Sequence, residues 1–162
     1  MTKEAALFTF FSTLPKLAYD KDSGGYAAVE NEEETNLPAY VNTAVPDGAE
    51  LPYLTYTVLI GAYGEPACSL TVNIWCRTTD EAEPNAYARE LGKLIPRGGV
   101  LLHCDGGGMR IYRGNPWCQS LVDDTDRTIK RRYFNVEVEY ITEECIFQSA
   151  VVGGFKGDID LR

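Results

Sequence analysis

The sequence predicts a single α+β domain, in which an antiparallel or mixed sheet of about four to five strands has two helices packed on one face and carries a long acidic loop. Three observations support this prediction. Two segments place apolar residues at helical spacing, several others alternate apolar and polar residues, and most neighbouring strands are joined by turns too short for parallel crossovers. With 162 residues the chain is long enough for one domain with its own core, so residues 1–162 are treated as one unit.

The first part of the chain is predicted to form an N-terminal helix over residues 1–15, followed by an acidic loop over residues 19–50. Pro15 stops the helix after five apolar residues at helical spacing, which are Ala6, Leu7, Phe10, Phe11 and Leu14. The loop segment is acidic, is interrupted by Gly and Pro, and has no regular period. Loops of this length tend to be functional or disordered, so part of it is expected to be mobile.

Residues 51–141 are predicted to form the core of sheet and helix. Alternation occurs in two runs, YLTYTVLIGAY and ACSLTVNIWCRT, and the turn residues GAYGEP between them predict an antiparallel hairpin. A second helix is expected in DEAEPNAYARELGKLIPRGG, where Asp80 is a good N-cap and Pro96 with Gly98 ends the helix. Its apolar stripe consists of Tyr87, Leu91, Leu94 and Ile95.

The rest of this core is predicted to contain two short strands, an irregular segment and a last strand. The short strands are expected in VLLHC and MRIYRG, and the irregular segment in NPWCQSLVDDTD. The last strand is expected in RYFNVEVEYI, because polar residues there alternate with Phe134, Val136, Val138 and Tyr140. Residues 142–162 are broken by glycines and are treated as a C-terminal tail.

The chain's one histidine, His103, lies beside Cys104 and Asp105 in LLHCDGGGMRIYRGNP, which raises the question of a catalytic centre. A phosphate-binding glycine loop leads from a strand into a helix, whereas DGGG here leads into the strand-forming residues MRIYR. Asp-Gly between two apolar segments is instead a hairpin signal. Neighbouring residues of one strand point to opposite faces, so His103 and Cys104 cannot exchange a proton. The stretch is therefore predicted to be a hairpin turn.

No other motif indicates catalysis. The five cysteines form no C-x-x-C pair and no metal-ligand set, so they are expected to be reduced and mostly buried. The acidic clusters at Glu30–Glu34 and Asp123–Asp126 lack the spaced ligands and the glycine of a calcium loop. No nucleophile elbow, zinc-protease motif or phosphate-binding P-loop is present. We therefore predict a protein that is not an enzyme, with no catalytic, cofactor-binding or metal-ligating residue.

Charge and hydropathy restrict the partners that the chain can have. The formal net charge of −9 argues against nucleic acid as the default partner. One basic cluster, made of Arg127, Lys130, Arg131 and Arg132, can contact phosphate or an acidic partner, or can form a solvated edge. No apolar run approaches the roughly 18 residues that span a bilayer. The N-terminal segment indicates a helix rather than an export signal, so the chain is expected to fold in a cytosol, without a membrane.

The order of these segments resembles the tail-terminator and tail-completion proteins of long-tailed bacteriophages, a group that includes minor capsid and minor tail proteins. The resemblance covers roughly residues 37–141 and is clearest in LPAYVNTAVPDGAELPYLTYTV. A Pro-Tyr-hydrophobic-x-Tyr entry to the first strand is matched by Pro52, Tyr53, Leu54 and Tyr56. A strand closing on an apolar-aromatic-x-Arg pattern is matched by LTVNIWCRT, and AYARELGKLI matches the helix that follows. The acidic insertion and the C-terminal tail depart from the pattern.

This resemblance implies a structural protein of the virion, assembled in the cytoplasm of a bacterial host. Such proteins form a homo-oligomeric ring, usually a hexamer, at the head-proximal end of the tail, where they stop growth of the tail tube protein. They also present the head–tail joining surface to a head-completion or neck protein, while DNA passes through without specific binding. The candidate residues for subunit or partner contacts are Trp75, Arg77, Trp117, Arg127, Lys130, Arg131 and Arg132. For each tryptophan, ordinary packing in the core or sheet is the alternative.

Two other functions are compatible with the sequence. A cytosolic protein-binding adaptor would use the acidic segment to fold onto a basic partner, and would be a monomer without that partner. A small cysteine hydrolase would use one of the five cysteines as its nucleophile, and this thiol would react fast at neutral pH. The resemblance does not separate a terminator from a neck or head-completion protein, nor an active phage from a defective prophage.

Overall fold

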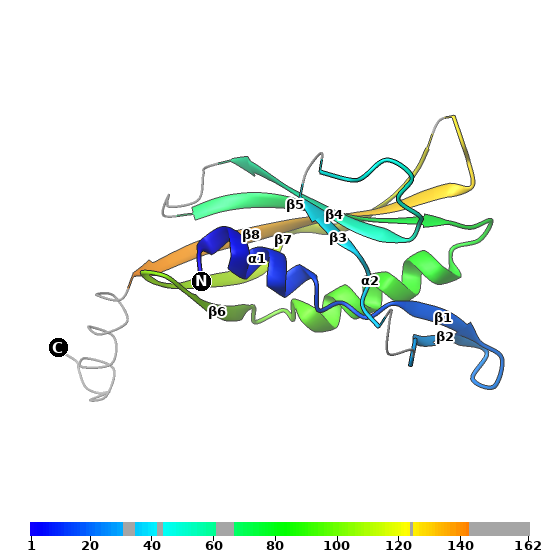
Figure 1. Ribbon diagram of the computed structural model, residues 1–162, viewed down its shortest axis with the longest axis horizontal. Helices are drawn as coiled ribbons and strands as arrows, with labels where there is room; N and C mark the ends of the chain where they lie inside the picture. Colours follow the sequence, from blue (N-terminus) through cyan, green and yellow to red (C-terminus); the bar gives the residue numbers. More distant parts are fainter. Residues whose placement is uncertain (31–34, 42–43, 61–66, 124, 143–162) are drawn as a thin grey trace.

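The computed structural model describes residues 1–30, 35–41, 44–60, 67–123 and 125–142 (Figure 1). Within these ranges the chain has two helices and eight strands, so the predicted α+β class is confirmed. The helices are α1 (Lys3–Phe11) and α2 (Ala82–Leu94). The strands are β1 (Leu17–Asp20), β2 (Gly25–Ala28), β3 (Ala39–Val41), β4 (Tyr53–Ile60), β5 (Ala67–Arg77), β6 (Val100–Cys104), β7 (Gly107–Val122) and β8 (Ile129–Thr142).

Six strands form the main sheet, in the order β3-β4-β5-β8-β7-β6, and β1 and β2 form a separate two-stranded sheet. Neighbours in the main sheet are antiparallel except β3 and β4, which run parallel, so the sheet is mixed. The prediction of about four to five strands was too low, since the segment taken for a loop contributes β2, β3 and half of β1. Both outermost strands, β3 and β6, contact α1, so the main sheet curls around this helix (Figure 1).

Both helices cover the same face of the main sheet, which is called the inner face below. Tyr56, Val72 and Phe134 lie in one row across β4, β5 and β8 on this face, and all three are buried. The ring of Phe11 on α1 packs against Tyr56, with 4.8 Å between the ring centroids. Arg132, also on this face of β8, bonds to side chains at the start of α2. The predicted placement of two helices on one face is therefore confirmed.

The helix α1 is shorter than the predicted helix over residues 1–15. It begins after Thr2, whose side-chain oxygen accepts a hydrogen bond from a backbone N–H of the first turn, and it ends at Phe11. Leu14 lies beyond the helix but is still buried in the core. The apolar spacing therefore predicted the buried residues correctly, whereas the helix ends before the last of them, Leu14.

The prediction of a continuous loop over residues 19–50 is wrong. β1 and β2 form an antiparallel hairpin, and β3 pairs with the first strand of the core. The hairpin packs against α2, because the backbone N–H of Leu17 donates to the hydroxyl of Tyr87 at 2.9 Å and both residues are buried. These strands have only three or four residues each, which is too short for alternation to be recognised. Part of the predicted loop was expected to be mobile. Within it, residues 31–34 and 42–43 lie outside the described residues.

The hairpin of β4 and β5 and the helix α2 follow the predicted order. The predicted hairpin turn at residues 61–66 lies outside the described residues. The N-cap position of α2 is Glu81 rather than the predicted Asp80, whose carboxylate instead accepts the N–H of Ala82 at 3.0 Å. The Glu81 side chain does not cap the helix, because it is directed to β8. The predicted apolar stripe is buried at Tyr87, Leu91 and Ile95, and partly buried at Leu94.

β7 runs through most of the segment predicted to be irregular, so that prediction is wrong for residues 115–122. A bulge makes this possible. Arg113 and Cys118 are five residues apart, whereas their partners on β8, Val136 and Phe134, are two residues apart. Regular pairing resumes beyond the bulge and continues to the end of β7, and the turn that follows connects directly to β8.

Arg113, at the start of this bulge, caps the C-terminal end of α2. Its Nε donates to the carbonyl of Ile95 and its Nη2 to the carbonyl of Gly92, both at 2.8 Å. Its guanidinium also lies over the ring of Trp117, 4.8 Å from the centroid, and Trp117 packs against Phe134. A cation is favourable beside the last carbonyls of a helix, so the bulge and α2 hold each other in place.

The remaining predictions of structure concern the chain after α2. β6 and β7 form the hairpin predicted for the His103 stretch: Cys104 pairs with Gly107, and Asp105 and Gly106 form a two-residue loop. Gly106 has a φ of 85°, which favours glycine at this position. The predicted last strand is β8. Residues 143–162 of the predicted tail lie outside the described residues.

Candidate functional site

β8 distributes the basic cluster over the two faces of the main sheet. Alternation along the strand places Lys130 and Arg132 on the inner face and Arg131 on the opposite face, which is called the outer face below. Arg127 precedes β8 and is exposed. Because β8 lies between β5 and β7, most of the cluster belongs to a central strand. The interpretation of the cluster as a solvated edge is therefore wrong.

The two inner-face cations bind one carboxylate at the start of α2. Arg132 is 3% exposed, and its Nη2 donates to Glu81 Oε1 at 2.7 Å and to Asn85 Oδ1 at 2.8 Å. Lys130 Nζ lies 3.2 Å from Glu81 Oε2. The hydrogen bond from Arg132 is the main reason why the pKa of the Glu81 carboxyl is lowered. Arg132 and Lys130 therefore attach α2 to the sheet, and the burial of Arg132 leaves it almost no surface for a partner.

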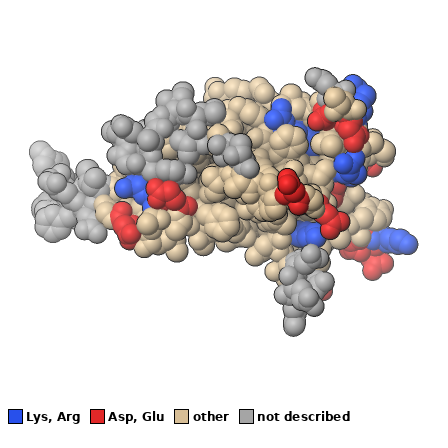
Figure 2. Space-filling view, turned by 45° about the horizontal axis from the view of Figure 1, so that its top comes forward, with Lys and Arg blue, Asp and Glu red and all other residues tan. Residues whose placement is uncertain are grey.

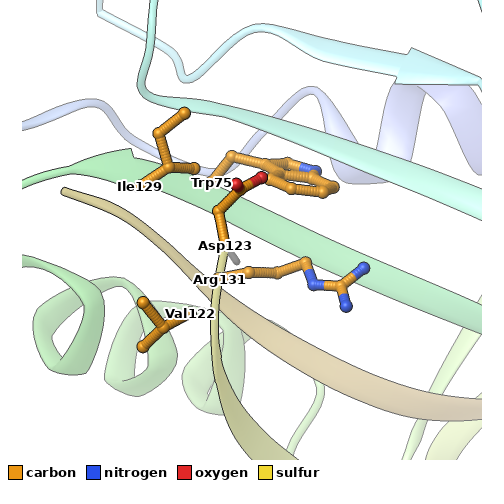
Figure 3. A pocket seen from close by; sticks show the side chains of 5 residues that line it. All are labelled: Trp75, Val122, Asp123, Ile129 and Arg131. Carbon is orange, nitrogen blue, oxygen red and sulfur yellow. The ribbon is translucent and has the colours of Figure 1, made fainter. Parts of the chain in front are cut away.

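The outer-face cation stacks on aromatic rings. The guanidinium of Arg131 lies 5.0 Å from the ring centroid of Trp75, its cross-strand partner on β5, and 5.9 Å from that of Tyr133. The indole N–H of Trp75 donates to the hydroxyl of Thr55 at 3.0 Å. Beside this stack is a hollow of about 220 Å³, shown in Figure 3 and here named the Trp75–Arg131 hollow. Its lining residues are Trp75, Val122, Asp123, Ile129 and Arg131.

The turn between β7 and β8 closes one end of this hollow. Asp123 Oδ1 accepts hydrogen bonds from the backbone N–H groups of Thr125 and Asp126 and from the Thr125 hydroxyl, at 2.7 to 2.9 Å. Asp126 Oδ2 binds Arg77 Nη1 at 2.7 Å, and its other oxygen accepts from Thr128. These bonds lower the pKa of the Asp123 carboxyl and lower that of Asp126 to about 2. The turn is thus fixed by its own carboxylates.

The predicted contact residues divide into an outer group and an inner group. Trp75, Arg77, Arg127 and Arg131 lie on or next to the outer face near the β7–β8 turn. Trp117, Lys130 and Arg132 lie on the inner side, against the core and α2. The view in Figure 2 shows charges of both signs towards both ends of the molecule, with more of them at the end that carries the β7–β8 turn, and a middle that is largely uncharged. The outer group is therefore the candidate functional site.

The sequence did not single out Tyr133, Val122 or Ile129 as site residues. Ile129 and Tyr133 lie two residues before and two residues after Arg131 on β8. Because side chains two residues apart share a face of a strand, all three lie on the outer face once Arg131 is known to face outward. Val122 and Asp123 reach the hollow through the pairing of β7 with β8, in which Val122 lies opposite Lys130. That register depends on the bulge in β7, which the alternation of apolar and polar residues does not predict.

The described cysteines bear on the alternative of a cysteine hydrolase. Cys76 is fully buried, and burial raises the pKa of its thiol to about 12, with the charge of Glu83 as a further cause. Burial also raises the pKa of Cys68 and Cys118. A thiol with a raised pKa is a poor nucleophile at neutral pH. Cys145 lies outside the described residues.

His103 and Cys104 are neighbours in β6, so their side chains point to opposite faces, as predicted. In the described part of the chain, no three His, Cys, Asp or Glu side chains lie close enough together to hold one metal ion. Neither helix is long and apolar enough to cross a membrane.

The two edges of the main sheet form a second candidate surface. β3 and β6 are its outermost strands, and within the described ranges neither pairs with a strand on its outer side. Each carries a partly exposed apolar side chain: Val41 is 38% exposed on β3, and Leu101 is 48% exposed on β6. Edges of this kind can accept a strand from another chain.

Comparison of the sequence with models of known protein families found no match, and comparison with curated proteins found none either. The function is therefore argued from the geometry and from the order of the segments.

Proposed function

We propose that this protein is a structural subunit of a phage or prophage, which closes into a ring, caps the tail tube and forms part of the head–tail joining surface. The order of its segments supports this proposal, since it resembles that of tail-terminator and tail-completion proteins. The observation that carries the proposal is the presence of two different open edges, β3 and β6, at opposite sides of one sheet.

Two different edges favour head-to-tail contacts between copies. An interface in which one edge of a subunit binds the other edge of the next is heterologous, and repeated heterologous contacts close into a ring when the rotation per subunit allows it. Closure also pairs every edge and removes the aggregation hazard of an open sheet. A contact of β6 with itself would instead give a two-fold dimer, which leaves β3 unpaired.

The backbone of β6 is oriented for such a contact. Cys104 and Gly107 close the two-residue loop, and the closing pair of such a loop is hydrogen-bonded. Hydrogen-bonded pairs alternate along antiparallel strands, so the backbone N–H and C=O groups of Leu101 and His103 point to the open edge of β6. A neighbouring copy can pair with these groups through its β3 edge.

The charge of the chain fits the other parts of the proposal. A net charge of −9 repels nucleic acid, so DNA can pass through a ring of this protein without binding to it. The faces of the ring would contact the tail tube protein and a head-completion or neck protein. The protein would be assembled in the host cytoplasm and would remain at the head-proximal end of the tail in the virion.

Substitutions at the two edges test the proposal. Leu101→Lys places a charge at the β6 edge, and Val41→Lys places one at the β3 edge. Each variant alone is expected to lose the ring in sedimentation velocity experiments. Each keeps one intact edge, so a mixture of the two is expected to form a dimer and to stop there. Phe8→Lys is the matched control, because Phe8 is 45% exposed on α1 and belongs to neither edge.

Rings that persist in Leu101→Lys, or a mixture that yields no dimer, would contradict head-to-tail pairing of the two edges. A wild-type protein that stays monomeric and gains order only when a basic partner is added would favour the adaptor instead.

A further inference from the structure

Among the basic residues around the β7–β8 turn that lie in strands, Arg131 differs from its neighbours in its partners. Arg77 binds Asp126, and Lys130 and Arg132 both bind Glu81. Arg131 has no carboxylate partner in the part of the chain that the structure describes, and its contacts there are with two aromatic rings. The Trp75–Arg131 hollow therefore contains a positive charge that forms no ion pair with the described residues.

The position of this charge is fixed before any ligand arrives. Arg131 belongs to a central strand, and its guanidinium contacts the ring of Trp75 on β5 and that of Tyr133 on its own strand. Trp75 is in turn fixed by its hydrogen bond to Thr55, which is itself buried. A stacked guanidinium keeps its planar array of donors and loses little conformational entropy when it binds a carboxylate.

The other lining residues restrict what can bind beside Arg131. Ile129 is partly buried and lies two residues from Arg131 on the same face of β8, so it offers apolar contact at this end of the hollow. The Asp123 carboxylate also lines the hollow and points away from the side chain of Val122 (Figure 3), and its lowered pKa keeps it charged at neutral pH. This negative charge in the hollow disfavours polyanions such as DNA and favours a ligand that has one carboxylate and also N–H donors.

The size of the hollow points to part of a peptide. Pockets for small metabolites and cofactors usually have about 300–1,000 Å³, whereas this hollow has about 220 Å³. A space of this size takes one or two side chains of an extended segment. The ends of β5, β7 and β8 around it belong to the sheet and so form a rigid surface.

From these observations we infer that the Trp75–Arg131 hollow binds an acidic side chain, flanked by an apolar one, on an extended segment of a partner protein. The carboxylate pairs with the Arg131 guanidinium, the apolar neighbour packs on Ile129, and backbone N–H groups face Asp123. A single subunit carries the complete hollow, so this inference does not depend on ring formation and can fail or hold independently of it.

The test uses the full-length chain labelled with ¹⁵N and two short capped peptides, acetyl-Leu-Asp-Leu-amide and acetyl-Leu-Asn-Leu-amide. The chain has two tryptophans, so the indole N–H signal of Trp75 can be assigned with Trp117→Phe. The Asp peptide, added up to about 10 mM, is expected to shift the Trp75 signal and to bind about tenfold more tightly than the Asn peptide.

Arg131→Gln is expected to abolish this difference between the peptides, whereas Arg127→Gln, which removes an exposed cation near the same turn, is expected to keep it. Arg131→Lys retains the positive charge but lacks the planar guanidinium that stacks on the aromatic rings, and it is expected to bind the Asp peptide with reduced affinity. It also serves as the test variant if Arg131→Gln does not fold. Equal shifts with both peptides, no shift with either, or tighter binding of a short DNA duplex would overturn the inference.

Discussion

Arg131 and Arg132 are adjacent in the sequence and have opposite functions in the structure. Arg132 is buried on the inner face, where it binds Glu81 and Asn85 at the start of α2. Arg131 is partly exposed on the outer face and stacks on Trp75. Arg132 attaches a helix to the sheet, and Arg131 is available to a ligand.

The ion pair of Glu81 with Arg132 is expected to stabilise the fold. Glu81→Gln leaves the buried guanidinium without its carboxylate, and should reduce the free energy of unfolding by about 1–2 kcal/mol, because Glu81 itself is half exposed and partly screened. Glu90→Gln removes a surface ion pair with Lys93 and should change the free energy of unfolding by less than about 0.5 kcal/mol. Urea denaturation of both variants measures the difference. Equal effects would show that the pair is not a specific anchor of α2.

The same pair predicts a dependence on pH. The pKa of Glu81 is lowered by folding from its ordinary value of 4.5, so its contribution is complete above that value and is lost as the pH falls through the folded pKa. The difference between wild type and Glu81→Gln should therefore be constant near neutral pH and should shrink as the pH falls below 4.5 and through the lowered pKa of the folded state. Burial raises the pKa of Glu83, which acts in the opposite sense, but this effect is common to both proteins and cancels.

Part of this arrangement was predictable from single residues. The alternation of Phe134, Val136 and Val138 predicts a buried face, and continuing it by two residues places Arg132 on that face. What the sequence does not show is that Glu81 lies opposite, because that contact depends on how α2 packs on the sheet. A charged residue in phase with an apolar stripe therefore indicates a buried partner without identifying it.

At the scale of elements, β7 shows how a strand can continue through residues that normally end one. Asn115 and Pro116 begin the segment that the sequence predicts to be irregular. At the bulge, β7 has three residues more than the facing stretch of β8, and regular pairing continues after it. By contrast, α2 was predicted correctly, since its helical period extends over three turns and suffices to identify it.

The bulge predicts a specific effect of one added methyl group. A Cβ at Gly114 would lie 2.9 Å from the Cβ and from the carbonyl oxygen of Asn135, so Gly114→Ala must displace β7 or β8. We expect a loss of about 1–3 kcal/mol in the free energy of unfolding, measured by urea denaturation. Gly98→Ala is the control, because a Cβ there meets nothing within 4 Å, and it should be neutral or slightly stabilising. Similar values for the two variants would contradict a tightly packed bulge.

At the scale of the whole molecule, both candidate surfaces result from the strand order. The order β3-β4-β5-β8-β7-β6 places β8 at the centre, which brings Arg131 next to Trp75, and it leaves β3 and β6 at opposite edges. The sequence predicted the class of the fold but neither this order nor the parallel pairing of β3 with β4. Strand order is a property of long-range pairing, and alternation within each strand does not encode it.

The most direct test of head-to-tail assembly is the mass of the wild-type protein in solution, measured by sedimentation velocity over a wide range of concentrations and combined with negative-stain images. The account predicts a closed ring, as a discrete species whose mass is a multiple of the 18.0 kDa chain and whose images show rotational symmetry around a central hole. A two-fold dimer, or a monomer at every concentration, would contradict it.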